Sequence, residues 1–320
     1  MNAPIVHAPQ SVPRLSPHEE SILRVLLYFN IFDHPLTAAE VFSFYPCALI
    51  TLEELRRVLE SKSLQRIVKS KNGYYFLQSA SESCVETRFE KERLAKRRIE
   101  TAMAVARFIR TFPFVRAVML SGELSKGVAS KNSDIDFVIV ARRRRLWICR
   151  SLLILFKKAF LFNSKKYFCL NHFITEDYLT VELRNIYSAT EIATLKPLYN
   201  HPHYVEYINA NRWIKDFFPH WNLGSPGCVE GRDSRNIVQR VVESLLPTHA
   251  GDKLDTWLLG LWRQLWQRRY AHLSEEERNH KFRCAPSIST AYGEDFQQKV
   301  LAQYAYRLRH YGISGFDQRN

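Results

Sequence analysis

The 320-residue sequence lacks several features that mark specialised classes of protein. Its six cysteines are scattered without Cys-x-x-Cys spacing, which argues against a zinc knuckle and a disulfide framework. The start has no combination of basic residues, apolar stretch and small-residue cleavage site, so no secretion signal is expected. No internal repeat or low-complexity tract is visible. These absences favour a folded protein of the reducing cytoplasm, and the length favours two or three domains.

A long uninterrupted apolar run is also lacking. The most apolar segment, 146–162, contains Arg150, Lys157 and Lys158, whereas a transmembrane helix needs about 20 largely uncharged residues. No transmembrane segment is therefore expected, and a helix covering a sheet is the main interpretation. Peripheral membrane contact is the alternative, both here and for a tryptophan-containing stripe at helical spacing in 254–272.

Acidic residues are absent from 137 to 175, although the whole chain contains 32 of them. Much of the net charge of +14 arises there, from Arg142, Arg143, Arg144, Arg145, Arg150, Lys157, Lys158, Lys165 and Lys166. Such a segment could bind a triphosphate, a nucleic acid or an anionic membrane, or it could be a solvated helix face.

Three capping-box patterns predict three short helices near the start: Ser16-x-x-Glu19, Thr37-x-x-Glu40 and Thr51-x-x-Glu54. We expect the first helix to end near Asn30 and the third near Ser61. Two β-rich runs, 64–69 and 74–77, then flank an Asn-Gly pair that is typical of a hairpin turn. Helix, helix, helix, hairpin is the layout of a winged helix, predicted for residues 15–80 after a disordered lead at 1–14.

Cations in this module suit contacts with the phosphates of a DNA duplex: Arg56, Arg57 and Lys62 on the third helix, and Lys69 and Lys71 on the wing. Acidic residues share the third helix, however, and winged helices also serve as protein-docking modules. DNA and a protein partner both remain open.

The rest of the chain predicts an α/β (α+β) fold. A long helix from Glu82 to Arg110 should form a connecting segment (81–112). A sheet domain (113–220) should contain strands at 114–120, 135–140 and 167–174 and a helix at 143–162. Further helices are predicted at 189–198, 205–218, 235–245 and 254–272. A flexible linker at 221–232 should open a helical C-terminal region (221–320).

Asp134 and Asp136 are the residues that point most directly to chemistry. Two carboxylates two residues apart at the start of an apolar strand lie on one face of a sheet and could hold a hard cation. Upstream, another apolar run ends in Ser121-Gly122, where a glycine allows the backbone to approach a phosphate. Together they predict a metal-dependent nucleotide site.

This pattern of apolar strand, Gly-containing loop and Asp-x-Asp strand resembles the nucleotidyltransferase superfamily that includes DNA polymerase beta. Segments 169–177 and 195–199 are similar to those of a bacterial group with an N-terminal winged helix. The resemblance implies a mixed sheet and Mg²⁺, with two ions possible, held by Asp134 and Asp136. It also implies transfer of a nucleoside monophosphate from a nucleoside triphosphate to a hydroxyl or phosphate acceptor that the sequence does not identify.

The same resemblance suggests roles for other residues. Ser121, Gly122 and Ser125 would contact the triphosphate, and Lys126 would neutralise the departing pyrophosphate. The family usually has a serine where this chain has Glu123. A third carboxylate is expected where this chain has Asn171, so Asn171 is the candidate third metal ligand, with Glu176, Asp177 and Glu182 as substitutes. The alternatives to an enzyme are a catalytically silent, nucleotide-sensing or DNA-binding regulator and a scaffold at an anionic membrane.

Overall fold

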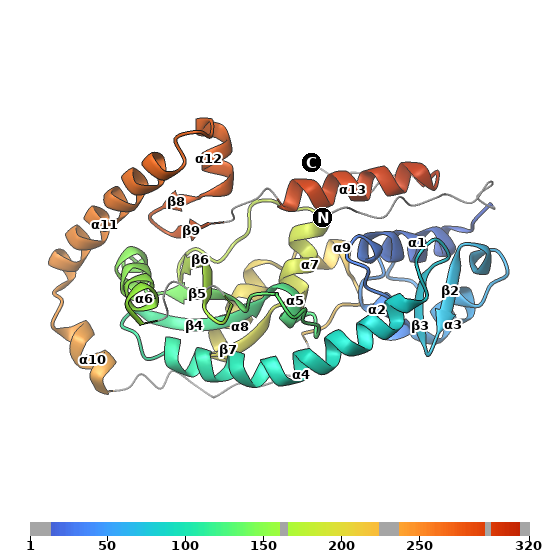
Figure 1. Cartoon of the computed structure of the whole chain (residues 1–320), viewed down its shortest axis with the longest axis horizontal. Helices are drawn as coiled ribbons and strands as arrows, with labels where there is room; N and C mark the ends of the chain where they lie inside the picture. Colours follow the sequence, from blue (N-terminus) through green and yellow to red (C-terminus); the bar gives the residue numbers. More distant parts are fainter. Residues whose placement is uncertain (1–13, 161–165, 224–236, 292–295, 314–320) are drawn as a thin grey trace.

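The computed structural model describes residues 14–160, 166–223, 237–291 and 296–313 (Figure 1). Almost all of the predicted disordered lead and most of the linker predicted at 221–232 lie outside these ranges. The described residues form a mixed α/β protein with two sheets, which confirms the predicted fold class at that level. None of their helices combines the length and the apolar character that a bilayer crossing requires.

The N-terminal module contains the three predicted helices, α1 (Pro17–Asn30), α2 (Ala38–Ser43) and α3 (Leu52–Leu59). Each begins with its predicted capping box, in which the cap hydroxyl and the glutamate three residues later satisfy each other's backbone amides. A three-stranded antiparallel sheet follows in the order β1 (Leu36–Thr37), β3 (Tyr74–Leu77), β2 (Val68–Lys71). The module therefore formed largely as its local sequence signals predict.

The hairpin of this module turns at Asn72 and Gly73, whose φ angles of 52° and 79° suit a type I′ turn. The first strand is shorter than predicted, because Leu64–Arg66 forms a 3₁₀ turn closed by the Ile67 amide donating to the Leu64 carbonyl at 2.9 Å. The strand begins only at Val68.

The 27-residue helix α4 (Ser83–Ile109) leads from the module along the second sheet, where it contacts β4 and β7 (Figure 1). The second sheet has the order β7-β4-β5-β6-β9-β8. Its centre consists of the three predicted strands, β4 (Val115–Ser121), β5 (Asp136–Ala141) and β6 (Cys169–Thr175). β4 pairs antiparallel with β5, and β5 pairs parallel with β6 through the crossover helix α6 (Leu146–Phe160). The sheet is therefore mixed.

The outer strands of this sheet were not predicted. β7 (Lys196–Tyr199) replaces the end of the helix predicted at 189–198, since α7 (Ile186–Thr194) stops before Pro197, which an edge strand tolerates and a helix interior does not. β8 (Cys284–Ala285) and β9 (Ile288–Thr290) come from the segment predicted to be helical. The helix predicted at 205–218 is two helices, α8 (His201–Ala210) and α9 (Ile214–Phe217).

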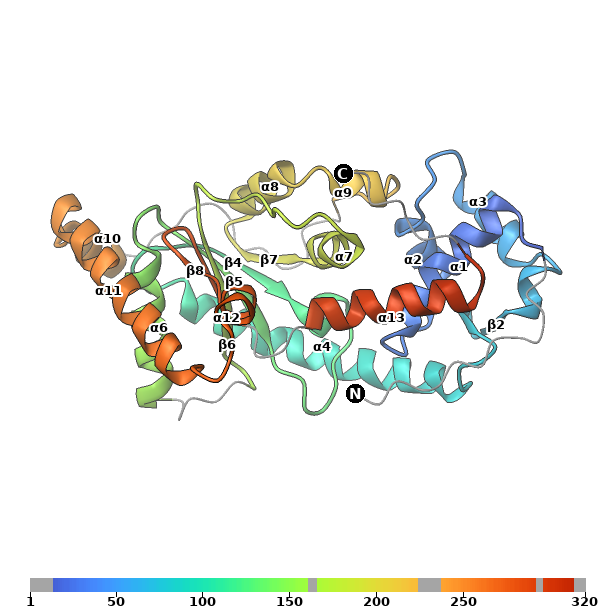
Figure 2. The same cartoon turned by 90° about the horizontal axis from the view of Figure 1, so that it is seen from above.

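The C-terminal segment is divided between the two ends of the molecule (Figures 1 and 2). α11 (Thr248–Arg269) lies beside α6, and α10 (Ile237–Ser244) precedes it and contacts the start of β4, whereas α13 (Phe296–His310) lies along α1; α12 (Glu275–Lys281) lies between α11 and α13 in the chain. Tyr304 and Leu308 of α13 belong to the same apolar core as Leu23 and Leu27 of α1. The described residues of 221–320 therefore pack against the cores of the two sheets, and among these residues no separate core is found.

Candidate functional site

The segment that ends in Ser121-Gly122 and the segment with Asp134 and Asp136 meet at one end of the second sheet. Ser121, the last residue of β4, pairs with Asp136, the first residue of β5. Between the strands, the short helix α5 (Gly122–Ser125) begins at Gly122, whose φ of +71° is in the left-handed region. A Cβ atom at Gly122 would lie 2.5 Å from Oδ2 of Asp136. Only glycine fits here, so the close approach of backbone and carboxylate is built into the fold.

Asp134 and Asp136 are both partly buried. Burial raises the pKa of Asp136, and the negative charges of Asp134 and Glu191 raise it further, while the Cys169 thiol and Lys126 oppose the shift. The site therefore concentrates negative charge that its surroundings only partly compensate.

Hydrogen bonds from α4 hold the loop that precedes Asp134. The buried Arg98 donates to the carbonyl of Ser133 at 2.6 Å, to its hydroxyl at 3.0 Å and to the carbonyl of Lys131 at 2.7 Å. On the other side, the amide of Ile135 donates to the Lys166 carbonyl at 3.1 Å. These bonds fix the backbone on both sides of Asp134, which is what a site with defined geometry requires.

Lys126 is close to this carboxylate group but is directed to another acid. Its Nζ lies 2.8 Å from Oε1 of Glu191 on α7 and 3.3 Å from the carbonyl oxygen of Gly122. Sequence reasoning missed Glu191, because it lies 55 residues after Asp136 in an ordinary amphipathic helix. No local motif distinguishes it.

Glu123 and the two serines have contacts that bear on nucleotide binding. The carboxylate of Glu123 accepts from the Ser130 amide at 3.1 Å and from its hydroxyl at 2.9 Å, so it is occupied by the following loop. The Ser125 hydroxyl is buried and donates to the Gly122 carbonyl at 2.8 Å. Ser121 donates to the Asp136 carbonyl over a long 3.4 Å. Of the two serines, Ser121 has the hydroxyl with the weaker internal bond.

Asn171 is near the site but is separated from Asp136 by a cysteine. Its Nδ2 donates to Sγ of Cys169 at 2.9 Å, and the Cys169 thiol is bonded to Asp136. Burial, followed by the charge of Asp136, raises the pKa of that thiol. Among the described residues, no group of three or more His, Cys, Asp and Glu side chains could hold a metal ion. In the part of the chain that the structure describes, Asp134 and Asp136 are therefore not joined by a further side chain in an arrangement that would hold a metal ion.

The substitutes suggested for the third carboxylate lie elsewhere. Glu176 follows the opposite end of β6 and accepts from the Arg143 amide at 3.1 Å. Asp177 pairs with Arg143 at 2.9 Å, and Glu182 pairs with Arg283 at 2.9 Å. These three expectations were wrong, because residues before and after a strand are separated by its whole length.

The arginines that follow β5 form ion pairs with carboxylates of the same chain. Arg144 and Arg145 both pair with Asp252 of α11, while Arg116 and Arg142 pair with Glu243 of α10. We call Arg116, Arg142, Arg145, Glu243 and Asp252 the anchor cluster. Together with the pairing of Arg143, it shows that the run 142–145 connects neighbouring elements, although the side chains of Arg143 and Arg144 remain 69% and 66% exposed.

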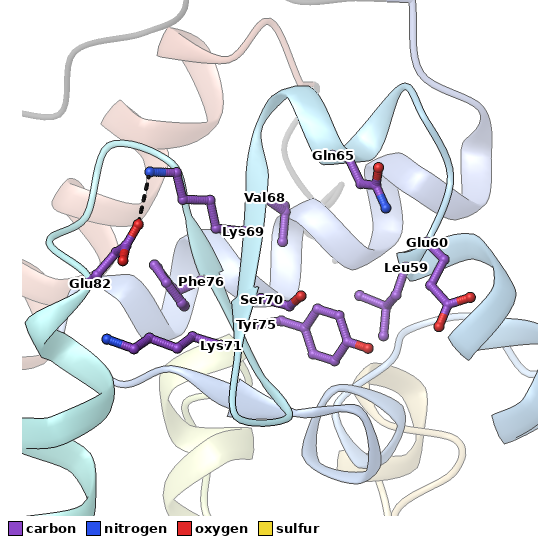
Figure 3. Close-up of a pocket in the computed structure, with 10 residues that line it drawn as sticks. All are labelled: Leu59, Glu60, Gln65, Val68, Lys69, Ser70, Lys71, Tyr75, Phe76 and Glu82. Carbon is purple, nitrogen blue, oxygen red and sulfur yellow. Dashed lines mark hydrogen bonds and ion pairs between the residues drawn. The ribbon is translucent and has the colours of Figure 1, made fainter.

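The β2–β3 hairpin of the N-terminal module also has paired cations. Lys69 lies 3.4 Å from Glu82 and Lys71 lies 2.6 Å from Glu86, both on the side of α4, and Arg57 pairs with Glu53 within α3. Figure 3 shows Lys69 and Lys71 on the wall of an open hollow of about 470 Å³ beside Tyr75. The hollow also contains the carboxylates of Glu60 and Glu82, so its charge is mixed.

Comparison of the chain with protein-family models, curated proteins and solved structures found no match. The geometry around Gly122 and Asp136 is therefore the basis on which a function can be argued.

Proposed function

We propose that the chain is a Mg²⁺-dependent nucleotidyltransferase, in which a nucleotidyltransferase-type sheet domain is joined to an N-terminal winged helix. It would transfer a nucleoside monophosphate from a nucleoside triphosphate to a hydroxyl or phosphate acceptor. The observation that supports the proposal is the contact between Gly122 and Asp136, in which a bare backbone turn lies against a carboxylate whose pKa is raised in part by the charge of Asp134. A cytoplasmic location remains a prediction from the sequence.

The donor atoms of the site fit Mg²⁺ in one particular way. This ion is usually held by one or two carboxylates together with substrate phosphates and water, and less often by an all-protein cage. Asp134 and Asp136 supply two carboxylates whose mutual repulsion a cation would relieve. When bound, Mg²⁺ would neutralise charge on the triphosphate and stabilise the leaving pyrophosphate.

The chain's own residues have separate tasks in this proposal. Gly122 lets the Asp136 carboxylate lie directly against the backbone turn, since any Cβ there would clash with Oδ2. Lys126 would exchange Glu191 for the phosphates of the departing pyrophosphate, a change of partner that leaves its charge compensated. Arg98 holds the loop that precedes Asp134 in position through hydrogen bonds to its backbone. Asn171 could contribute only through its Oδ1, because its Nδ2 donates to Cys169.

The proposal is tested by measuring pyrophosphate release from each nucleoside triphosphate with and without Mg²⁺, in the presence of pooled hydroxyl and phosphate acceptors. Asp134→Asn and Asp136→Asn should abolish a Mg²⁺-dependent signal. Asp177→Asn is the matched control, because this aspartate lies at the opposite end of the sheet, paired with Arg143. Equal turnover in all three variants would contradict the proposal.

A catalytically silent, nucleotide-sensing regulator is the second candidate. It is favoured by the absence of a third carboxylate among the described residues around Asp136 and by the use of Asn171 as a donor to Cys169. Nucleotide binding that needs Mg²⁺ and Asp136, without turnover of any acceptor, would support it.

The DNA-binding form of the regulator depends on the winged helix. Lys69 and Lys71 of the wing are paired with α4, which leaves Arg56 and Lys62 as the exposed cations to test. Duplex affinity that falls with salt and with Arg56→Ala would support DNA as the partner. Without such an effect, a protein partner at this module is the better reading.

A further inference from the structure

α10 and α11 form one end of the long axis of the molecule, opposite the N-terminal module, in both views (Figures 1 and 2). The inner sides of these helices hold all three acidic residues of the segment 237–273. Glu243 and Asp252 belong to the anchor cluster, and the buried Asp255 accepts from the amides of Trp147 and Ile148 at 2.9 Å each. No carboxylate of this segment therefore remains for its outer side.

The outer side of α11 has an apolar stripe at helical spacing. Leu254, Trp257, Leu261 and Leu265 follow one another at intervals of three, four and four residues, and all are exposed, Trp257 by 62%. α10 has Ile237 and Val241 exposed at the same spacing, with Leu245 directly after its end, and Ile237 is 78% exposed. Large apolar side chains in such a contiguous arrangement mark an interaction surface.

Exposed cations accompany this stripe: Arg240, Lys253, Arg268 and Arg269. On a helical projection, Arg268 continues the stripe beyond Leu265, and Lys253 and Arg269 flank it. The next carboxylates along the chain, Glu275 to Glu277, belong to α12, beyond the turn that ends α11. The described outer surface of 237–273 is therefore apolar and positively charged.

We infer that α11, assisted by α10, docks in the interfacial plane of an anionic lipid bilayer. Leucine and tryptophan side chains on one face with lysine and arginine beside them are the composition that binds such an interface. Charge complementarity favours an anionic bilayer over a second copy of this chain as the partner of this surface. Two copies would bring two positive surfaces together, and the net charge of the chain is +14. The helix is too polar to span the bilayer, so it lies on the surface.

The test uses the full chain and sedimentation with vesicles of phosphatidylcholine alone or with about one third phosphatidylserine. Binding should require phosphatidylserine and weaken as salt is raised. Trp257→Glu/Leu261→Glu and, separately, Arg268→Glu/Arg269→Glu should each lower the partition coefficient by roughly tenfold or more. Leu49→Glu and Lys62→Glu are matched controls on exposed residues of the N-terminal module and should leave binding unchanged.

A second readout reports the depth of insertion. Tryptophan fluorescence should shift to the blue and be quenched by lipids brominated in the acyl chain, and Trp257→Phe should remove most of this response while binding persists. All variants are first compared with the parent by thermal melting, because exposed substitutions should not alter folding.

Three results would overturn the inference. The first is equal binding to neutral and anionic vesicles, and the second is binding that the α11 substitutions do not change. The third is self-association in analytical ultracentrifugation that Trp257→Glu/Leu261→Glu abolishes while no vesicle binding is found, which would identify the surface as an interface between copies of this chain.

Discussion

Charged side chains cluster beside the second sheet both in the anchor cluster and at the candidate site. The two clusters differ in how far their opposite charges are balanced. In the anchor cluster, the two carboxylates Glu243 and Asp252 are each met by arginines, and most of the cluster is buried. In the candidate site, Asp134, Asp136 and Glu191 outnumber Lys126. Matched charges fasten elements together, whereas an uncompensated excess is a reason to look for a ligand.

The largest expected effect comes from removing one carboxylate of the anchor cluster, where opposite charges are matched. Glu243→Gln should lower the free energy of unfolding by about 3–5 kcal/mol, because the buried Arg116 would lose the carboxylate to which it donates two hydrogen bonds, while Glu176 lies farther away at 3.9 Å. Urea denaturation measures the change. Glu53→Gln, which removes an exposed partner of Arg57, is the control and should cost about 0.5 kcal/mol or less. Similar losses for both would show that the anchor cluster is no stronger than a surface pair.

A histidine in the sheet provides the second prediction. Burial, with the nearby charge of Arg283, lowers the pKa of His172 to about 4. The unfolded chain, with an ordinary pKa near 6.5, then binds more protons than the folded chain between these values, so stability should fall as the pH drops from about 6.5 to about 4.

His172→Gln should remove about 1–3 kcal/mol of this pH dependence, and chemical denaturation at pH 7 and pH 5 would detect the part lost by pH 5. His272→Gln, at an exposed histidine beyond α11, serves as the control and should leave the slope unchanged. An unaltered slope in His172→Gln would show that this histidine is not kept neutral by the fold.

Asp136→Asn should act in the opposite direction to Glu243→Gln. Because the pKa of Asp136 is raised in the folded chain, its charge opposes folding at neutral pH, and that penalty disappears below the ordinary pKa. Asp136→Asn should therefore stabilise the protein by about 0.5–1 kcal/mol while abolishing the proposed activity. Destabilisation, measured by urea denaturation at pH 7, would indicate that Asp136 has a structural role instead.

The smallest effect concerns the pair of Lys126 and Glu191, and it depends on the proposed function. Glu191→Gln should free Lys126 and remove a repelling charge, which should strengthen Mg²⁺-nucleotide binding by roughly two- to fivefold. Titration calorimetry with each nucleoside triphosphate measures this change. Lys126→Met should weaken binding, and weaker binding in both variants would mean that the pair acts as one structural unit.

Sequence reasoning succeeded where the determinants are close together in the chain. Each capping box spans four residues, the Asn-Gly turn spans two, and Gly122 lies within fourteen residues of Asp136. In these cases the chemistry of a few neighbouring side chains decides the local structure, so the pattern alone was enough to predict it.

The failures involve partners that are distant in the chain. β9 pairs with β6 across more than a hundred residues, and its three residues contain no pattern that predicts a strand. Glu191 and Arg98 reach the candidate site from two helices whose patterns only predict packing. The basic run was read as a surface because its partners, Glu243 and Asp252, lie a hundred residues further on. Such contacts depend on tertiary structure.

The position of α13 against α1 has a consequence for biosynthesis. Tyr28 of α1 contacts Tyr304 edge to face, and Arg307 bonds to Asn30, so the first module lacks part of its core until α13 has been translated. At ribosomal speeds of 5–20 residues per second, the module would wait on the order of ten to forty seconds for α13. During that interval the uncovered side of α1 is exposed on the nascent chain, which makes the ribosome-bound intermediate a natural client for a chaperone.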